Sequence, residues 1–268
     1  MIEHMFDRVN RRPAMRDDGA VRAATDGPAA AVRLRPLTAR SAILSLLLGT
    51  HPPSATVREL VAFGRQVAIN ESAVRAALTR MVAAGDLHRD TGTYTLSARL
   101  LERQQRQDEA LEVPAGDWDG LWRVAAVVAT GKDSTSRLHL RRSMLAAHFG
   151  ELREGLWLRP DNLGWAPGAE IAGDIELMRA RPDGDPEELA RRLFTPHRWA
   201  ATGHDLLAHA VRTTTPHDRL AAFAAIVRHL THDPLLPADL LPSDWPGAAL
   251  RAAYDGFRDE VVAFRRTD

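Results

Sequence analysis

Residues 70–96 contain the pattern that most restricts the fold: a short amphipathic helix followed at once by a tight hairpin. In INESAVRAALTRMVAAG, Asn70 is a favourable N-cap and Gly85 can adopt the left-handed conformation that ends a helix. The next residues, LHRDTGTYTL, alternate around Thr91 and Gly92, which predicts a two-residue turn between two strands. A helix joined this closely to a β ribbon is typical of a winged helix-turn-helix.

The predicted helix has two unlike sides. One side carries apolar residues at helical spacing and is expected to be buried: Val74, Leu78, Met81 and Val82. The other side has only small or cationic side chains: Ser72, Arg75, Ala76, Thr79 and Arg80. Small side chains allow close approach to a DNA groove, and arginines bind guanine edges or phosphates. We therefore expect this side to enter the major groove, while His88 and Arg89 on the hairpin contact the flanking backbone.

Two further helices are expected before this one. LTARSAILSLLLGT is predicted to begin behind a cap at Thr38 and to bury one face: Ile43, Leu44, Leu47 and Leu48. After a proline-rich break, Thr56 begins a shorter helix that is expected to end at Gly64. Helix-turn-helix units also serve in protein contacts, so a protein-interaction module that does not bind DNA remains an alternative.

Charge and composition limit the class of protein. The 35 basic and 35 acidic residues give zero formal net charge, which argues against binding nucleic acid by bulk charge but allows a local basic face. The absence of cysteine excludes disulfides, thiolate zinc sites and cysteine nucleophiles. Because no apolar run reaches the length of a membrane span and the N-terminus lacks a signal-peptide core, we expect a cytoplasmic protein with no membrane partner. Residues 1–36 lack steady periodicity and are predicted to be a mostly disordered arm.

Residues 113–190 are predicted to alternate between short strands and helices. GLWRVAAVVAT, ELREGLWLRP and DIELMRARP are each expected to form a strand, DSTSRLHLRRSMLAAHFG a helix, and DPEELARRLF a helix capped by Asp185. The order β-α-β-β-α predicts a small ferredoxin-like sheet. The first of these helices is expected to point four residues inward: Leu138, Met144, Leu145 and Phe149. Arg141 and Arg142 are expected to point outward.

Residues 191–268 predict a mainly helical domain. PHDRLAAFAAIVRHLTHD aligns Leu220, Phe223, Ala224 and Val227 on one face. WPGAALRAAYDGFRDEVVAFRR aligns Leu250, Tyr254, Phe257, Val261 and Phe264. The prolines of PLLPADLLPSDWP, between the two helices, forbid a continuous helix and leave several leucines exposed. We expect this domain to help form a twofold homodimer, although the leucines could instead fold back onto their own helices.

This third of the chain is also rich in histidine: His197, His204, His209, His217, His229 and His232. His229 and His232 share a helix face, and Asp233 follows them. No second pair has matching spacing, and zinc needs three or four converging ligands. We therefore favour cap and surface roles for these histidines, and predict neither a metal site nor a cofactor.

Three stretches in order resemble the PaaX family of bacterial transcriptional repressors. They are ESAVRAALTRMVAAGDLHRDTGTYTLSAR, then WDGLWRVAAVV with RLHLRRSMLAAHFGELREGLWLRPDNL, and finally DPLLPADLLPSDWPGAALRAAYDGF. The resemblance implies an α+β protein with a winged helix DNA-binding domain at 37–112, a central Cas2-like domain at 113–190 and a helical dimerisation and effector domain at 191–268. It also implies a dimer that binds operator DNA at phenylacetic acid catabolism genes and is released by an acyl-CoA such as phenylacetyl-CoA.

An acyl-CoA effector would need aromatic contacts for its acyl group and cations for its phosphates. Candidates that are close in sequence are Trp122, Arg141, Arg142, Trp157 and Arg159. The likeness to Cas2 also raises a metal-dependent nuclease as an alternative function. Phosphodiester cleavage needs carboxylates that hold a cation, but the first central strand ends Val128-Ala129-Thr130 with no acid, and Asp133 is better explained as a cap. We therefore predict no catalytic residues and no enzymatic activity.

Overall fold

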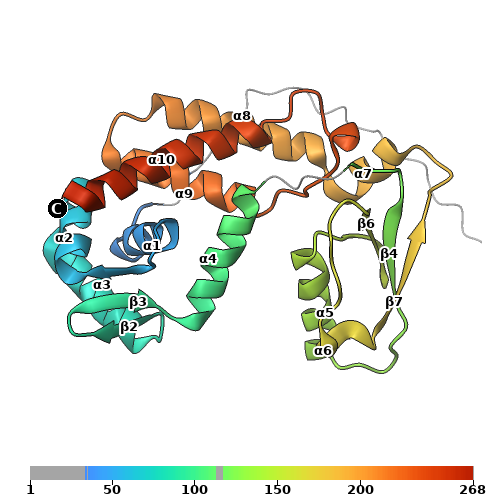
Figure 1. Ribbon diagram of the computed structural model, residues 1–268, viewed down its shortest axis with the longest axis horizontal. Coiled ribbons are helices and arrows are strands. Elements are labelled where there is room, and N and C mark those ends of the chain that lie inside the picture. The colour runs from blue at the N-terminus through green and yellow to red at the C-terminus, as the bar shows by residue number, and fades with distance from the viewer. Residues whose placement is uncertain (1–33, 35, 113–116, 268) are drawn as a thin grey trace, which may run out of the picture. The chain divides into compact units, whose positions relative to one another are not determined.

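The structure is a computed structural model that describes residue 34, residues 36–112 and residues 117–267 (Figure 1). The predicted arm at residues 1–36 lies almost entirely outside this part of the chain. Residues 37–112 form helices around a small antiparallel sheet, and the elements in order are α1 (Ala39–Gly49), β1 (Ser54–Thr56), α2 (Val57–Gln66), α3 (Glu71–Ala83), β2 (Leu87–Asp90), β3 (Thr93–Leu96) and α4 (Ala98–Leu111).

Local sequence sets the ends of these elements, as predicted. Thr38 and Thr56 each form a capping box, with Ser41 and Glu59 as the reciprocal partners. The Asn70 side chain accepts a hydrogen bond from the backbone N–H of Ala73 at 2.8 Å and so caps α3. Gly85 follows the helix with a φ of +68°, which confirms its predicted role in ending α3.

The predicted hairpin is present, and a third strand joins it. Strands β2 and β3 pair antiparallel, and the turn residues Thr91 and Gly92 have φ values of +43° and +88°, as a type I′ turn requires. Strand β1 pairs with the other side of β3, so the sheet order is β1-β3-β2. Strand β1 was not predicted, because it is only three residues long and directly follows the prolines at 52–53.

Gly64 has a different role from the one predicted. Helix α2 continues past it to Gln66, and Gly64 is buried where α2 meets α3. A Cβ atom at this position would lie 2.6 Å from Cγ2 of Val74. Glycine is therefore needed here for close helix packing and not for ending the helix.

Replacing Gly64 with alanine is expected to lower the free energy of unfolding by about 1–3 kcal/mol, because the added methyl group overpacks the contact between α2 and α3. The matched control is Gly256→Ala in α10, where an added Cβ meets no atom within 4 Å. That control should be neutral or slightly stabilising, since alanine is the better helix former. Urea denaturation of both variants makes the comparison. Equal stability of the two would show that the close packing at Gly64 is not needed.

Helix α4 was not predicted, because its buried stripe contains polar side chains. Its buried residues are Leu100, Gln104, Gln107 and Ala110. Nε2 of Gln104 lies 3.1–3.2 Å from the carbonyl oxygens of Leu47, Leu48 and Thr50, at the end of α1. These contacts satisfy carbonyls that a helix end leaves without intrahelical partners.

The central part of the chain forms a four-stranded antiparallel sheet with helices on it. The elements are β4 (Trp122–Val127), α5 (Ser134–Ala146), β5 (Gly150–Arg153), β6 (Leu156–Pro160), α6 (Ala169–Ala172), β7 (Ile175–Ala180) and α7 (Pro186–Phe194), and the strand order is β5-β6-β4-β7. ELREGLWLRP was predicted as a single strand. It is a hairpin, β5 and β6, whose turn contains Gly155 with a φ of +78°.

Each face of this sheet has its own apolar core. Helix α5 covers one face, where Leu140 and Met144 pack with Ala125 and Trp157. The other face packs against α7 and the segment around Leu236 and Leu240; Trp122 and Leu158 lie there. The prediction for α5 was partly wrong: Leu138 and Leu145 are 47% and 52% exposed, and Leu140 takes the inward position instead.

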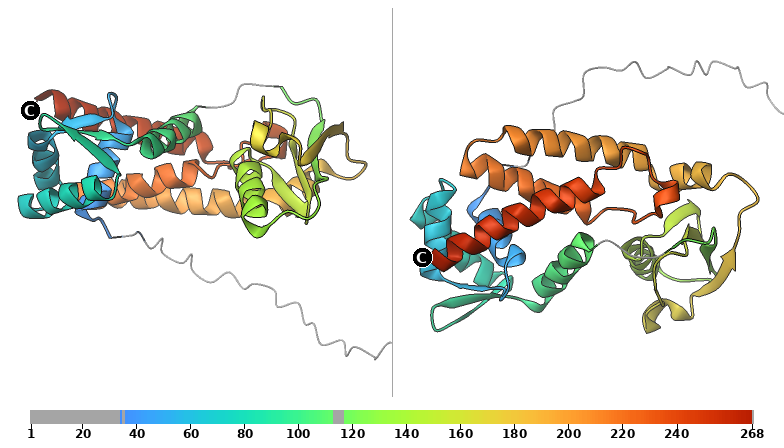
Figure 2. Two further views of the ribbon diagram at one scale, coloured as in Figure 1. Left: turned by 90° about the horizontal axis from the view of Figure 1, so that it is seen from below. Right: turned by 45° about the horizontal axis from the view of Figure 1, so that its top comes forward.

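The C-terminal region consists of α8 (Pro196–Arg212), α9 (Pro216–Leu230), the 3-10 turn η1 (Ala238–Leu240) and α10 (Gly247–Thr267). Helices α8, α9 and α10 lie side by side (Figures 1 and 2). The apolar faces of α9 and α10 are present as predicted, but α8 was not predicted. Every helix in the described part of the chain is too short or too polar to cross a membrane.

The leucines between α9 and α10 are neither exposed nor folded onto their own helices. Leu236 and Leu240 are buried against Trp122, Leu158 and Ala190 of the central region. The prediction that this segment leaves several leucines exposed is therefore wrong for Leu236 and Leu240.

The C-terminal helices also pack against the N-terminal ones. Leu220 of α9 and Val261 of α10 belong to the same buried core as α1, α2 and α3. Near the end of α10, Arg265 donates hydrogen bonds to Oγ1 of Thr50 at 2.8 Å and to the carbonyl of Ser54 at 2.7 Å. A displacement of α9 or α10 would therefore disturb its contacts with α1 and α2 directly.

Candidate nucleic-acid interface

The two sides of α3 are separated as the sequence predicted. Val74, Ala77, Leu78 and Met81 are buried, whereas the small and cationic residues are all exposed: Ser72, Arg75, Ala76, Thr79 and Arg80. Val82 was expected in the buried stripe but is 37% exposed, since it lies at the edge of that stripe near the helix end. We call the five exposed residues the α3 face.

Glu71 organises the cations at the start of the α3 face. Its carboxylate accepts hydrogen bonds from Nε of Arg75 at 2.8 Å and from Nη2 of Arg65 at 2.6 Å. These bonds, first that of Arg75 and then that of Arg65, lower the pKa of Glu71 below its usual value. Arg75 is therefore held along the helix while its side chain stays more than half exposed.

Arg80 lies further along the α3 face and is exposed. Within the described residues, no carboxylate lies within ion-pair distance of it. An exposed guanidinium without an internal partner keeps its donors available for an external acceptor such as a phosphate or a guanine edge. Thr79, beside it, donates its hydroxyl back to the carbonyl of Arg75 at 3.1 Å.

The hairpin places two more cationic or titratable side chains beside α3. His88 and Arg89 are exposed on β2, as predicted. The guanidinium of Arg89 lies 5.8 Å from the centre of the buried Tyr94 ring on β3. This contact gives Arg89 a defined position on the surface of the hairpin.

A buried carboxylate fixes the junction between α3 and the hairpin. Asp86 is 4% exposed and accepts hydrogen bonds from Arg40 of α1, at 2.8 Å, and from Arg99 of α4. Its backbone N–H donates to the carbonyl of Met81 at 2.9 Å, and its carbonyl accepts from the N–H of Ser97 at 3.0 Å. The role of Asp86 was not predicted, because its two arginine partners come from helices on either side of it in the chain.

The five residues predicted for an effector do not come together. Trp122 is fully buried on the α7 side of the central sheet, while Trp157 and Arg159 lie on the α5 side. The sheet itself separates Trp122 from the other residues. The five candidate residues therefore do not line a single pocket.

Arg159 is also unable to bind phosphates from its position. It is 3% exposed, and it donates to the carbonyls of Ala147, at 2.8 Å, and of Leu163. Its guanidinium lies 5.2 Å from the centre of the Phe149 ring. Burial lowers the pKa of Arg159 to about 10. These contacts make Arg159 a structural residue of the central core.

Arg141, Arg142 and Trp157 lie on the same side of the sheet. Arg141 and Arg142 are exposed on α5, and Arg141 pairs with Glu151 and lies 5.4 Å from the centre of the Trp157 ring. Arg141 and Trp157 line a cavity of about 550 Å³ together with Lys132. Lys132 is paired with Asp174 at 2.9 Å, so Lys132 and Arg141 both already have internal partners.

Asp133, His229 and His232, which were considered for catalysis or metal binding, form caps and contacts within the fold. Asp133 caps α5 by accepting a hydrogen bond from the N–H of Ser136 at 2.7 Å, as the sequence indicated. His229 stacks on Trp199 and its Nε2 lies 3.0 Å from the carbonyl of that residue, while Nδ1 of His232 lies 2.7 Å from the carbonyl of Arg228. In the part of the chain that the structure describes, no three His, Asp or Glu side chains are grouped so as to hold a metal ion.

Burial of two histidines predicts a fall in stability at acid pH. Burial lowers the pKa of His148 and of His229 below the usual 6.5. The unfolded chain therefore binds more protons than the folded one, and stability decreases as the pH falls below about 6.5. The slope reaches at most about 1.4 kcal/mol per pH unit for each histidine.

Urea denaturation at pH 7.5 and at pH 5.5 measures this effect. The double variant His148→Asn with His229→Gln is expected to lose less stability between the two pH values than the unchanged protein. Asparagine suits position 148 because the backbone there has a φ of +60°. The control is His197→Asn, which alters an exposed histidine. An equal loss in the double variant and in this control would contradict the assignment.

Comparison with known proteins places the chain in a family. Residues 38–100 match the family described as PaaX-like protein, residues 115–188 the PaaX protein central Cas2-like domain, and residues 191–265 the PaaX-like protein C-terminal domain. A solved structure of the uncharacterized protein Rv0674 from Mycobacterium tuberculosis is 46% identical, with a TM-score of 0.75, and the match covers 86% of this chain and 98% of that one. No curated protein sequence matches the chain. Since the three family matches follow one another over most of its length, the chain belongs to the PaaX family of regulators.

Proposed function

We propose that the chain is a sequence-specific DNA-binding transcriptional regulator in which residues 37–112 act as a winged helix-turn-helix. The observation that carries this proposal is the α3 face, where small residues and two arginines are exposed beside a β hairpin. In this arrangement α2 and α3 are the paired helices, α3 enters the major groove and the hairpin is the wing.

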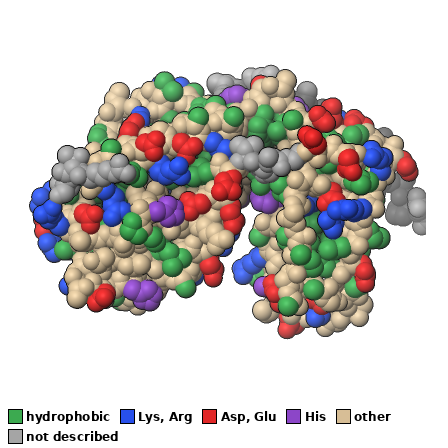
Figure 3. Space-filling model, viewed as in Figure 1, with side chains coloured by type: hydrophobic (Ala, Val, Ile, Leu, Met, Phe, Trp, Pro, Cys, Tyr) green, Lys and Arg blue, Asp and Glu red, His purple; other side chains and the backbone are tan. Residues whose placement is uncertain are grey.

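The chemistry of the α3 face fits duplex DNA. Arg75 donates a hydrogen bond to Glu71, whereas Arg80 has no carboxylate partner in the described chain. The two guanidiniums can therefore bind different acceptors on the DNA. Ser72, Ala76 and Thr79 are short enough for the helix backbone to approach base edges. Positive and negative side chains are mixed over the face of the molecule in Figure 3, so binding would depend on this local surface more than on net charge.

We extend the proposal to a cytoplasmic homodimeric repressor. Its targets would be the operators of phenylacetate or related aromatic catabolism genes, and an acyl-CoA such as phenylacetyl-CoA would release it. Membership of the PaaX family supports these finer points. A dimer would present two copies of α3 to half-sites about one duplex turn apart. The buried leucines at 236 and 240 cannot form the dimer contact, so exposed parts of the chain would have to supply it.

The test is selection of bound duplexes from a random pool, followed by titration of the selected duplex and of a scrambled duplex of equal length. The proposal predicts at least about 1000-fold tighter binding to the selected duplex, a steep decrease in affinity with salt, and two chains on each duplex. Titration of phenylacetyl-CoA into the complex then tests release. Equal affinity for both duplexes at every salt concentration would contradict DNA recognition.

A further inference from the structure

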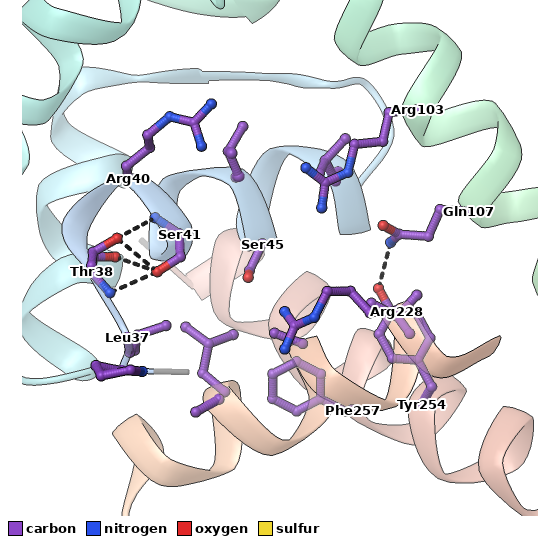
Figure 4. A pocket seen from close by; sticks show the side chains of 17 residues that line it. Leu37, Thr38, Arg40, Ser41, Ser45, Arg103, Gln107, Arg228, Tyr254 and Phe257 are labelled. Atoms are coloured by element: carbon purple, nitrogen blue, oxygen red, sulfur yellow. Dashed lines mark hydrogen bonds between the residues drawn. The ribbon is translucent and has the colours of Figure 1, made fainter. Parts of the chain in front are cut away.

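A cavity lies between the N-terminal and C-terminal helices, away from the α3 face. It encloses about 310 Å³ and is lined by residues of α1, α4, α9 and α10 (Figure 4). Most of its wall is apolar and includes Leu44, Leu48, Leu220, Val227 and Phe257. The volume is at the small end of the range of ligand pockets, which is about 300–1,000 Å³.

One side of the cavity is cationic. Figure 4 shows the guanidiniums of Arg103, from α4, and of Arg228, from α9, pointing toward the space beside Ser45 of α1. Arg40, also in the cavity wall, already donates a hydrogen bond to the carboxylate of Asp86. Gln107 donates to Oη of Tyr254 at 2.8 Å, so these two polar side chains satisfy one another.

Arg103 differs from Arg40 in having no acidic partner among the described residues. Among the described residues, no carboxylate lies within ion-pair distance of its guanidinium. Its pKa is lowered, first by burial and then by the charges of Arg40, Arg106 and Arg99. Arg103 is therefore an exposed guanidinium in the cavity wall that lies near other arginines and has no carboxylate partner, an arrangement that a bound anion would stabilise.

We propose that this cavity binds a small carboxylate with a compact apolar body, of the aryl or short alkyl class. The carboxylate would accept hydrogen bonds from Arg103 and from the hydroxyl of Ser45, and the apolar body would lie against Leu44, Val227 and Phe257. The volume of the cavity matches the free acid, whereas the nucleotide of a CoA thioester would have to lie outside it, so the thioester is tested as a separate probe.

The position of the cavity links a ligand there to α3. Helix α1 forms one wall of the cavity and packs through its other residues against α3, in a shared core. A ligand that binds one arrangement of α1 against α9 and α10 more tightly than another shifts the population between them. This regulatory step rests on the proposed function, whereas binding in the cavity does not.

Isothermal titration of the full chain, without DNA, tests the site. The probes are benzoate, phenylacetate and hexanoate, with phenylacetamide as the uncharged counterpart and phenylacetyl-CoA as a separate arm. At least one free carboxylate is expected to bind, and at least tenfold more tightly than the amide. Arg103→Gln is expected to weaken that binding at least tenfold, and Ala224→Leu, which fills the cavity, to abolish it.

Arg198→Gln is the matched control, because Arg198 is an exposed arginine on α8 that lies outside the cavity wall. It should bind the carboxylate like the unchanged protein, and thermal melts confirm that each variant is folded. Three results would overturn the proposal: no carboxylate binds at millimolar concentration, only the thioester binds, or Arg103→Gln binds as tightly as Arg198→Gln. Because DNA is absent, these results are independent of whether the α3 face recognises an operator.

Discussion

Replacing Arg251 with alanine is expected to lower the free energy of unfolding by about 3–5 kcal/mol. Arg251 is buried in α10 and donates to the carboxylate of Asp233 at 2.8 Å and to the carbonyl of Ala110 at 3.1 Å. Asp233 is also buried, and its second carboxylate oxygen accepts from the N–H of Leu235 at 2.9 Å. Loss of Arg251 would leave Asp233 charged, buried and without its cation.

This pair matters because it joins three distant parts of the chain. Ala110 lies in α4, Asp233 follows α9, and Arg251 belongs to α10. Urea denaturation of Arg251→Ala, with Arg191→Ala as the control, measures the effect. Arg191 forms only exposed ion pairs on α7, which contribute about 0–1 kcal/mol. Similar stability of the two variants would show that the buried pair does not hold these helices together.

The double variant Arg75→Ala with Arg80→Ala is expected to lose most operator affinity. Each arginine that reads a base contributes about 1–3 kcal/mol of specific binding. The two side chains occupy the same exposed face and have different internal contacts, so their losses should roughly add. Titration of the selected and scrambled duplexes at one salt concentration gives both the loss of affinity and the loss of discrimination.

Lysine at the same two positions separates charge from geometry. Arg75→Lys with Arg80→Lys keeps two cations but lacks the guanidinium fork, so binding to the scrambled duplex should persist while preference for the operator decreases. Arg142→Ala, on the exposed side of α5, is the control and should leave both affinities unchanged. If the double alanine variant binds the operator as this control does, the assignment of α3 to the major groove is wrong.

Much of the N-terminal region could be predicted because its signals are local. The capping threonines, Asn70 and Gly85 mark helix ends within a few residues of themselves, and the alternation around Gly92 fixes the hairpin. The exposed side of α3 followed from the same spacing, since helical periodicity assigns each residue to one side.

The two helices that were not predicted, α4 and α8, lack a strong stripe of large apolar residues. Helix α4 buries two glutamines, whose partners are carbonyls of α1 and the hydroxyl of Tyr254. Helix α8 has correct helical spacing, but its buried residues include Gly203 and two alanines, and a Cβ at Gly203 would lie 2.7 Å from Pro246. In both helices the burial is decided by a neighbouring helix and not by the hydrophobicity of the segment.

Contacts between distant parts of the chain also explain why the candidate effector residues were grouped incorrectly and why the Asp86 junction was not predicted. Residues close in sequence were grouped for an effector, but alternate residues of a strand face opposite sides of a sheet, so Trp122 and Trp157 belong to different cores. The junction at Asp86 and the cavity beside Arg103 combine side chains that are distant in sequence. Only the three-dimensional structure brings these residues together.

Because the chain contains no cysteine, a single introduced thiol can report directly where α3 lies on DNA. Ala76→Cys, in the middle of the α3 face, would carry an iron chelate that cleaves nearby DNA strands, and Ala252→Cys, exposed on α10, would serve as the control. Cleavage from position 76 is expected to be confined to a few base pairs within each operator half-site, with none from position 252. Cleavage from position 252 alone, or none from position 76 in a complex that still forms, would contradict the assignment of α3 to the major groove.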